Sequence, residues 1–296
     1  VTLTGTDDDN LLTFSDVVTI TAAFSESMIQ FPTISIEGTD INKNPLMPIY
    51  DFNKIGDDIY GDFEGDQTGF SLSMSKNGSR LVIGTIYDDV NGDASGQTKV
   101  FQWDGSQWTQ LGLDLNGAEG DHFGYSVDTS DNGNRIIVGS PYSDNNGQSS
   151  GSSKIYSWNG SSWVQLGSEI KGFSAGDLSG LAVSISGDGN TVAIGSMWNN
   201  ENGLKSGHTR IFTWDGNSWI QLGENIKGEN SGDHSGRSVD LSKDGKIVAI
   251  GAPHNSENGI DSGQTKVFSW NGSQWIQLGQ TLNGEAAGDQ SGISVS

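Results

Sequence analysis

One short segment recurs along this 296-residue chain at nearly constant spacing. It reads GDQTGFSLSMSKNG from Gly65, with close variants beginning at Gly120, Gly176 and Gly232 and a shorter copy, GDQSGISVS, beginning at Gly288. Successive copies are 55 or 56 residues apart. A fixed period of this length is typical of repeat architectures, in which each unit packs on its neighbours. The chain is therefore predicted to fold as an array of similar units.

Each unit contains four segments with the pattern of β-strands. A short segment such as YSVDTS is followed by Asn-Gly or Asp-Gly, which favours a two-residue hairpin turn. The next segment, such as RIIVGSPY, is almost entirely apolar, which predicts a strand buried on both faces. Segments such as TRIFTW and WIQLG then flank a second Gly-containing turn. Four antiparallel strands per unit are typical of a propeller blade, so we predict an all-β propeller with four full blades and partial blades at both ends.

The first part of the chain does not share the repeat. Residues 1–45 contain the alternating segments VTLT, VVTITAAF and TISIEG, which predict a short N-terminal β segment. This segment resembles the beginning of a bacterial immunoglobulin-like domain and covers roughly half of such a module. We therefore divide the chain into residues 1–45 and the propeller repeats of residues 46–296.

Composition narrows the classes of partner. Nine Trp and eleven Phe argue against a disordered chain in spite of 43 Gly. The formal net charge of −22 repels nucleic acids and anionic membranes. No apolar run approaches the ~20 residues of a membrane helix, and Cys is absent. We expect neither nucleic-acid binding nor membrane insertion.

Three repeat positions carry side chains suited to recognition or to blade contacts. The aromatic position follows the second strand and is predicted to bind a ligand: Tyr87, Tyr142, Trp198 and His254. The acidic position is interpreted as a turn cap, with a ring of cation-binding carboxylates as the alternative: Asp66, Asp121, Asp177, Asp233 and Asp289. The basic position is expected to pair with the acidic one: Lys99, Lys154, Arg210 and Lys266. Blade topology predicts that all three lie on one face.

Each unit also carries a pair of tryptophans around its last hairpin. The pairs are Trp103 and Trp108, Trp158 and Trp163, Trp214 and Trp219, and Trp270 and Trp275. We expect them to pack blade against blade, with a row of sugar-stacking rings as the alternative.

The loop DDVNGDASG is the best candidate for a calcium site. It offers the side-chain oxygens of Asp88, Asp89, Asn91 and Asp93, and calcium prefers six to eight oxygen ligands. The equivalent loops of the next two units carry fewer carboxylates. No cofactor is expected to be required.

Sequence motifs for catalysis are absent. The chain has no HExxH, no GxSxG and no cysteine nucleophile. Propeller glycosidases take their acid and base from different blades, which breaks the repeat symmetry. Because the units here are nearly interchangeable, the chain is predicted not to be an enzyme, and no catalytic residue is assigned.

The units resemble FG-GAP repeats, the blades of integrin-α-like propellers. Phe123-Gly124, YSV, IIVGSP and KIY carry the resemblance in one unit, and SVDLS, VAIGAP and TKVF carry it in another. The resemblance implies an extracellular or cell-surface module for adhesion or filament structure, whose partner is a protein, a glycan or a second copy. A lectin-like propeller is the alternative, and a propeller glycosidase is the weakest one. The DxDxDG calcium loop of integrin-type blades is missing, since the corresponding loops read TSDNGNR or SKDGK.

Overall fold

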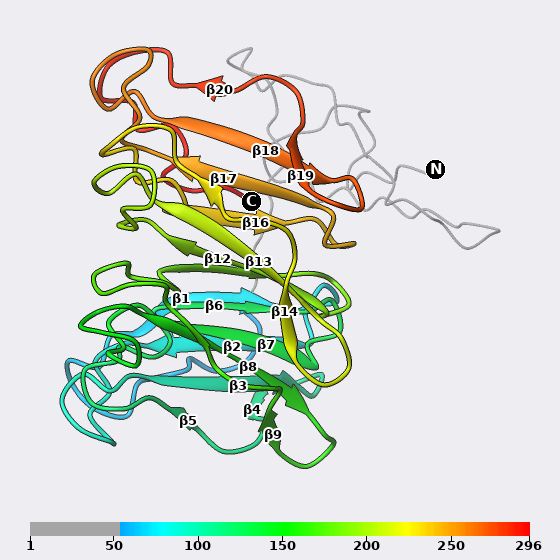
Figure 1. The fold of residues 1–296 in the computed structure, drawn as a ribbon. Coiled ribbons are helices and arrows are strands. Elements are labelled where there is room, and N and C mark those ends of the chain that lie inside the picture. The colour runs from blue at the N-terminus through cyan, green and yellow to red at the C-terminus, as the bar shows by residue number, and fades with distance from the viewer. Residues whose placement is uncertain (1–53) are drawn as a thin grey trace, which may run out of the picture. The chain divides into compact units, whose positions relative to one another are not determined.

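The computed structural model describes residues 54–296 of the chain (Figure 1). The predicted N-terminal β segment, with its immunoglobulin-like resemblance at residues 1–45, lies outside the described residues. Every regular element within residues 54–296 is a β-strand, which confirms the all-β prediction. This part of the chain has no helix that could cross a membrane.

The strands form four separate sheets, one for each complete repeat. Blade 1 contains β1 (Thr68–Met74), β2 (Arg80–Thr85), β3 (Gln97–Trp103), β4 (Trp108–Gln110) and β5 (Leu115–Asn116). Blade 2 contains β6 (Ser126–Thr129), β7 (Arg135–Ser140), β8 (Ser152–Trp158), β9 (Trp163–Gln165) and β10 (Ile170–Lys171). Blade 3 contains β11 (Ala182–Ile185), β12 (Thr191–Ser196), β13 (His208–Trp214), β14 (Trp219–Gln221) and β15 (Ile226–Lys227). Blade 4 contains β16 (Ser238–Leu241), β17 (Ile247–Ala252), β18 (Gln264–Trp270), β19 (Trp275–Gln277) and β20 (Leu282–Asn283).

Each blade is an antiparallel sheet in which the first four strands pair in sequence order. This confirms the prediction of four-stranded blades. A fifth strand of two residues, which the sequence pattern did not predict, also pairs with the third strand. In blade 1 the fourth strand pairs at Trp103↔Trp108, near one end of β3, and the fifth pairs at Gln97↔Asn116, at the other end.

The apolar core lies between neighbouring blades. Ile136 and Val138 of β7 belong to a cluster shared with blade 1, whereas Ile137 between them belongs to a cluster shared with blade 3. All three side chains are fully buried. Successive side chains of a strand point to opposite faces, so a strand with a blade on each side must be apolar throughout.

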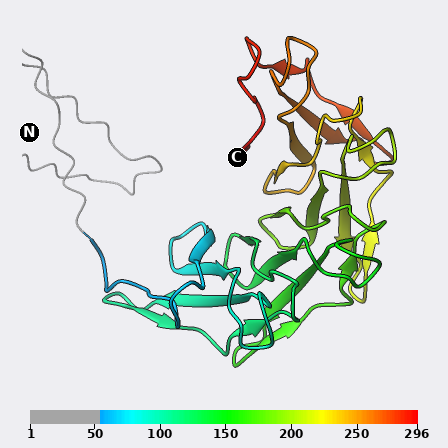
Figure 2. The same ribbon diagram turned by 90° about the vertical axis from the view of Figure 1, so that its left-hand side faces the viewer.

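The blades follow one another along an arc in Figure 2, coloured from cyan to orange. Their first strands lie next to one another, β1 by β6, β6 by β11 and β11 by β16. Asp128 of β6 links three blades, because its carboxylate accepts hydrogen bonds from Ser73 Oγ (2.8 Å) and from the Ile185 N–H (2.8 Å). Burial raises the pKa of Asp128.

Close backbone contacts explain one of the repeated glycines. A Cβ atom on Gly139 would overlap the carbonyl oxygen of Gly180 in the next blade. The blades therefore approach to a distance that only glycine allows at this position.

The paired tryptophans lie at the blade junctions, as predicted. Trp163, Trp219 and Trp275 each donate their Nε1–H to a leucine carbonyl of the preceding blade at 2.8 Å. Trp163 is buried, with 9% of its surface exposed, and the other two are half-buried. Their packing serves the framework, since each indole N–H is used inside the protein.

Candidate ligand-binding face

Two of the predicted ligand-binding residues belong to a continuous row of rings. Tyr87 and Tyr142 both contact His122, with ring centroids 5.2 and 4.6 Å apart, respectively. Tyr142 is also 6.3 Å from Tyr125, which is 4.9 Å from Phe70. We call these five residues the ring row. Phe70, Tyr87 and Tyr142 are 45%, 41% and 36% exposed, so the row combines mutual packing with accessible ring surface.

The other two predicted residues are placed differently. The Trp198 ring is covered by Lys205, whose Nζ lies 4.2 Å from the ring centroid. His254 contacts His234, with centroids 4.6 Å apart, and its Nδ1 lies 3.1 Å from Asp261 Oδ1. The four residues thus occupy equivalent positions in their blades, but they do not form a single row.

Two residues of each blade junction hold this face in shape. Ala94 in the loop after β2 has a φ of +48°, and His122 at the start of the next unit has a φ of +50°. The N–H of His122 donates to the carbonyl of Ala94 at 3.0 Å. The equivalent pair Lys205 and His234 has φ values of +53° and +55° and is joined in the same way at 3.2 Å. Non-glycine residues seldom adopt this conformation, which persists only where surrounding structure enforces it.

The acidic position serves as a turn cap, as interpreted from the sequence. Asp121 accepts the N–H of Ala118, and Asp177 accepts the N–H of Ser174 at 2.8 Å. The backbone of the acidic position also holds the aromatic position, since the N–H of Tyr87 donates to the main-chain carbonyl of Asp66 at 3.2 Å. Burial raises the pKa of Asp121, although the Ala118 N–H and the charge of Lys154 oppose this.

The basic position pairs with other acids than expected. Lys99 forms an ion pair with Asp62 at 2.6 Å, Lys154 approaches Glu169 at 3.9 Å, and Lys266 pairs with Glu229. The prediction of ion pairs with the acidic position is therefore wrong for these three lysines. The capping aspartates already accept backbone N–H groups, so carboxylates on neighbouring loops take the lysines instead.

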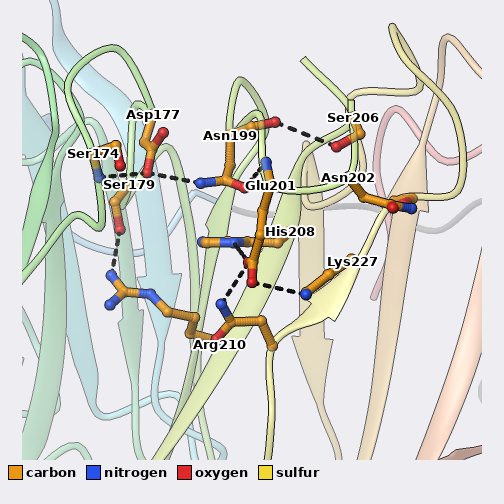
Figure 3. Close-up of polar contacts among 12 residues, drawn as sticks. Ser174, Asp177, Ser179, Asn199, Glu201, Asn202, Ser206, His208, Arg210 and Lys227 are labelled. Atoms are coloured by element: carbon orange, nitrogen blue, oxygen red, sulfur yellow. Dashed lines mark hydrogen bonds and ion pairs between the residues drawn. The ribbon is translucent and has the colours of Figure 1, made fainter. Parts of the chain in front are cut away.

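Blade 3 carries a buried polar cluster that the other blades lack (Figure 3). Arg210 donates to the Lys171 carbonyl (2.7 Å) and to Ser179 Oγ (3.3 Å), and the charge of Asp177 acts on it. His208 is fully buried, with its Nδ1 3.3 Å from Glu201 Oε2. Burial, followed by the charge of Arg210, lowers the pKa of His208.

Glu201 joins this cluster to the surface. Its Oε1 lies 2.8 Å from Lys227 Nζ, and its Oε2 accepts a hydrogen bond from Asn225 at 2.7 Å. Partial burial alone would raise the pKa of Glu201, but hydrogen bonds from Lys227, Asn225 and His208 lower it to about 2.

The residues of the calcium candidate serve the loop itself. Asp88 Oδ1 accepts the N–H of Val90 at 3.0 Å, and Asp89 Oδ1 accepts the N–H of Ala94 at 2.7 Å. Asn91 donates to the Gly117 carbonyl at 2.9 Å, and Asp93 is exposed. Within residues 54–296 no three His, Cys, Asp or Glu side chains are gathered as a metal site. Calcium binding by this loop stays a prediction.

An open groove of about 800 Å³ lies between blades 3 and 4. His254 and Asp261 line it together with Glu229, Glu257 and Asp233. The groove therefore brings the imidazole of His254 together with several carboxylates.

Sequence reasoning missed His122, Tyr125 and His234. His122 and His234 directly follow the repeated Gly-Asp pair, where the other units have Gln67, Leu178 and Gln290. The sequence distinguishes these two histidines only by a change of residue type at one repeat position, whereas the site prediction relied on positions that keep their residue type.

Comparisons with known proteins support the repeat assignment. The model of the FG-GAP repeat matches residues 113–156 and 228–268, so the predicted resemblance is confirmed for these two stretches. No curated protein sequence matches the chain.

Several solved structures share the fold. A proposed 6-phosphogluconolactonase from Bacteroides uniformis has a TM-score of 0.50 and 11% identity, over 83% of this chain and 63% of its own. A proposed 6-phosphogluconolactonase from Bacteroides fragilis has a TM-score of 0.51 and 10% identity, over 82% and 60%. The periplasmic gluconolactonase of Pseudomonas aeruginosa has a TM-score of 0.50 and 17% identity, over 72% and 56%. The chain spans about three fifths of these proteins, and the likeness shows the propeller fold.

These structures contradict the prediction that the chain is not an enzyme, because propellers of the same fold carry the names of gluconolactonases. The units are also nearly equivalent only in their strands and junctions, and their loop side chains differ. At one pair of positions blade 3 has Trp198 with Lys205, whereas blade 4 has His254 with Asp261.

Proposed function

We propose that this chain is a ligand-binding propeller module of an extracellular or cell-surface protein, and that it attaches to a protein or glycan partner through its ring face. The ring face comprises the ring row together with Trp198, His234 and His254. A location outside the cell belongs to the proposal and follows from the resemblance to FG-GAP repeats. The repeated framework would present the face, whereas its variable residues would select the partner.

The observation that carries the proposal is the accessible surface of the ring row. Tyr87 and Tyr142 remain more than a third exposed although both pack on His122. Contiguous exposed aromatic surface is unusual on soluble proteins and marks binding sites. Tyrosine suits such a site because it offers a large rigid ring and a hydroxyl at little cost in conformational entropy.

The test compares attachment by the wild type with that by a variant in which Tyr87, Tyr142, Trp198 and His254 are all Ala. Both proteins are applied to a glycan array and to surfaces coated with extracellular-matrix proteins. We expect the variant to lose attachment and to keep its β-sheet circular dichroism spectrum.

The matched control replaces apolar residues of similar exposure on the outer strands, Val164, Ile220 and Ile276, with Ala. This control should attach like the wild type. Normal attachment by the ring-face variant would show that another surface binds the partner.

Hydrolysis of a small ester or lactone is a second candidate function. It is supported by the contact between His254 and Asp261 in the open groove, because a carboxylate on Nδ1 leaves Nε2 available to accept a proton from water. The names of the similar structures make aldonolactones the first substrates to assay. Loss of lactone hydrolysis in the His254→Asn variant, measured by proton release, would support this candidate, and an inactive wild type would exclude these substrates.

A further inference from the structure

The four loops after the second strands differ at one position, whose side chain lies beside the aromatic residue in blades 3 and 4. This position lies seven residues after the aromatic residue and is occupied by Ala94, Ser149, Lys205 and Asp261 in blades 1 to 4. All four have a positive φ, between +47° and +53°, so the backbone presents them in the same way. The blades therefore differ in the side chain and share the geometry.

In blade 3 the chain itself places a cation on the aromatic ring. Lys205 Nζ lies 4.2 Å from the Trp198 centroid, well within the distance at which a cation–π interaction is favourable. In blade 4 the same position brings a carboxylate to the imidazole of His254. Both rings are thus partnered from within their own loops.

In blades 1 and 2 the same position leaves the ring open. The methyl group of Ala94 and the hydroxymethyl group of Ser149 cannot extend across a ring as Lys205 does. Tyr87 and Tyr142 accordingly remain 41% and 36% exposed. His122 lies between them and contacts both rings, so Tyr87 and Tyr142 each keep an exposed side on a shared stack of three rings.

Two carboxylates act on the ring between the tyrosines, whereas the cation Arg237 acts on Tyr125 at the other side of the ring row. The charges of Asp93 and Asp121 both act on His122, which lies between the two tyrosines. Lys154 belongs to the same junction but is directed to Glu169 and to the ring of Phe123. With a net charge of −22, the whole chain attracts cations and repels anions.

We propose that Tyr87, His122 and Tyr142 form a binding site for an organic cation, namely a lysine or arginine side chain from a basic segment of a partner protein. The bound ammonium or guanidinium group would take the place over Tyr87 and Tyr142 that Lys205 takes over Trp198. This inference rests on the proposed function and narrows the partner to a basic protein. Neutral glycans are an outcome of the test.

The test uses a fluorescein-labelled hexalysine peptide and the whole chain, with binding followed by fluorescence anisotropy. The key variant, Ala94→Lys with Ser149→Lys, copies the arrangement of blade 3 into blades 1 and 2. Because both positions already have the backbone conformation of Lys205, the substitutions should leave the fold intact. We expect hexalysine to bind about tenfold more weakly, as expected for the loss of one cation–π contact with its charge.

Two controls separate ring covering from simple charge. Gln107→Lys with Ser161→Lys adds the same charge at exposed hairpin turns and should bind like the wild type. Ala94→Gln with Ser149→Gln adds long neutral side chains and should bind more tightly than the double-lysine variant at 94 and 149. Higher salt should weaken binding to the wild type.

Equal hexalysine affinity in the wild type and in the variant with Lys at 94 and 149 would overturn the proposal. So would binding of neutral oligosaccharides, but not of hexalysine, in a manner that needs Tyr87 and Tyr142. In that case the ring face remains a ligand-binding surface and only the assigned ligand is wrong. The proposed function itself fails only if the variant lacking the four aromatic side chains still attaches normally.

Discussion

The tryptophan junctions and the ring face are built from the same repeat, yet they differ in how strictly the repeat is kept. At the junctions, Trp163, Trp219 and Trp275 donate the same hydrogen bond at the same distance of 2.8 Å. On the ring face, the aromatic position and the residue seven places later change from blade to blade. A side chain packed against the neighbouring blade must be complementary in shape to that blade, whereas a side chain exposed to solvent is not constrained in this way. This variation is what we expect of the face that we propose to bind the partner.

The largest effect should follow the loss of a junction tryptophan. Trp163→Ala removes the buried ring and its hydrogen bond to Leu111, and we expect the free energy of unfolding to fall by about 3–5 kcal/mol. Urea denaturation followed by circular dichroism measures this loss. The neighbouring Val164→Ala, at a site that is 48% exposed, should change little. Comparable losses in the two variants would remove the distinction between junction and surface.

A smaller loss is expected at the acidic position. Asp177→Ala leaves the N–H of Ser174 and the amide of Asn199 without their acceptor, at 2.8 and 3.0 Å in the wild type. Hydrogen bonds to charged groups contribute about 1.5–3 kcal/mol, so a loss of this order is expected in thermal or urea unfolding. Glu119→Ala, at an exposed site, is the control. Unchanged stability together with lost ligand binding would show that Asp177 belongs to the ligand site instead.

The ring row should contribute little to stability. Tyr87→Ala removes a single ring contact, the one with His122, at a residue that is already 41% exposed, and one pair of rings contributes about 0.5–1.5 kcal/mol beyond burial. We expect a decrease within this range in urea denaturation. A loss as large as that of Trp163→Ala would mean that the ring row is part of the framework.

The smallest effect should appear in the pH dependence of stability. Burial lowers the pKa of His208 in the folded protein, so the unfolded chain binds protons more readily as the pH falls below about 6.5. Stability should therefore decrease from neutral pH towards pH 5. The low pKa of Glu201, about 2, adds a separate loss between about pH 4.5 and pH 2.

His208→Gln isolates the first contribution, since blades 1 and 4 carry Gln97 and Gln264 at the equivalent position. Urea unfolding at pH 5 and pH 7.5 should show a smaller difference for this variant than for the wild type. His122 and His234 also have lowered pKa values because of burial, so part of the difference should remain. An unchanged difference would show that His208 does not titrate in this range.

The framework of residues 54–296 could be predicted from the sequence. The period of 55 or 56 residues, the Asn-Gly and Asp-Gly turns and the apolar second strands predict blades whose core lies between sheets. Ile136, Ile137 and Val138 illustrate why this succeeds, because a strand between two blades leaves a continuous apolar run in the sequence. The sequence also predicted that the acidic position caps a turn and that the tryptophans lie at the junctions. An Asp in a turn commonly accepts backbone N–H groups, and large rings repeated in every unit commonly pack between the units.

Which side chains meet on the ring face could not be predicted from the sequence, because it depends on contacts between units. His122 is 35 residues from Tyr87 and 20 from Tyr142, and it reaches both because one unit begins beside the loop of the preceding blade. The choice of Asp62, Glu169 and Glu229 as partners of the lysines depended in the same way on loops from separate parts of the chain. A repeat in sequence specifies which residues are equivalent, whereas contacts between units depend on how the blades are turned against one another.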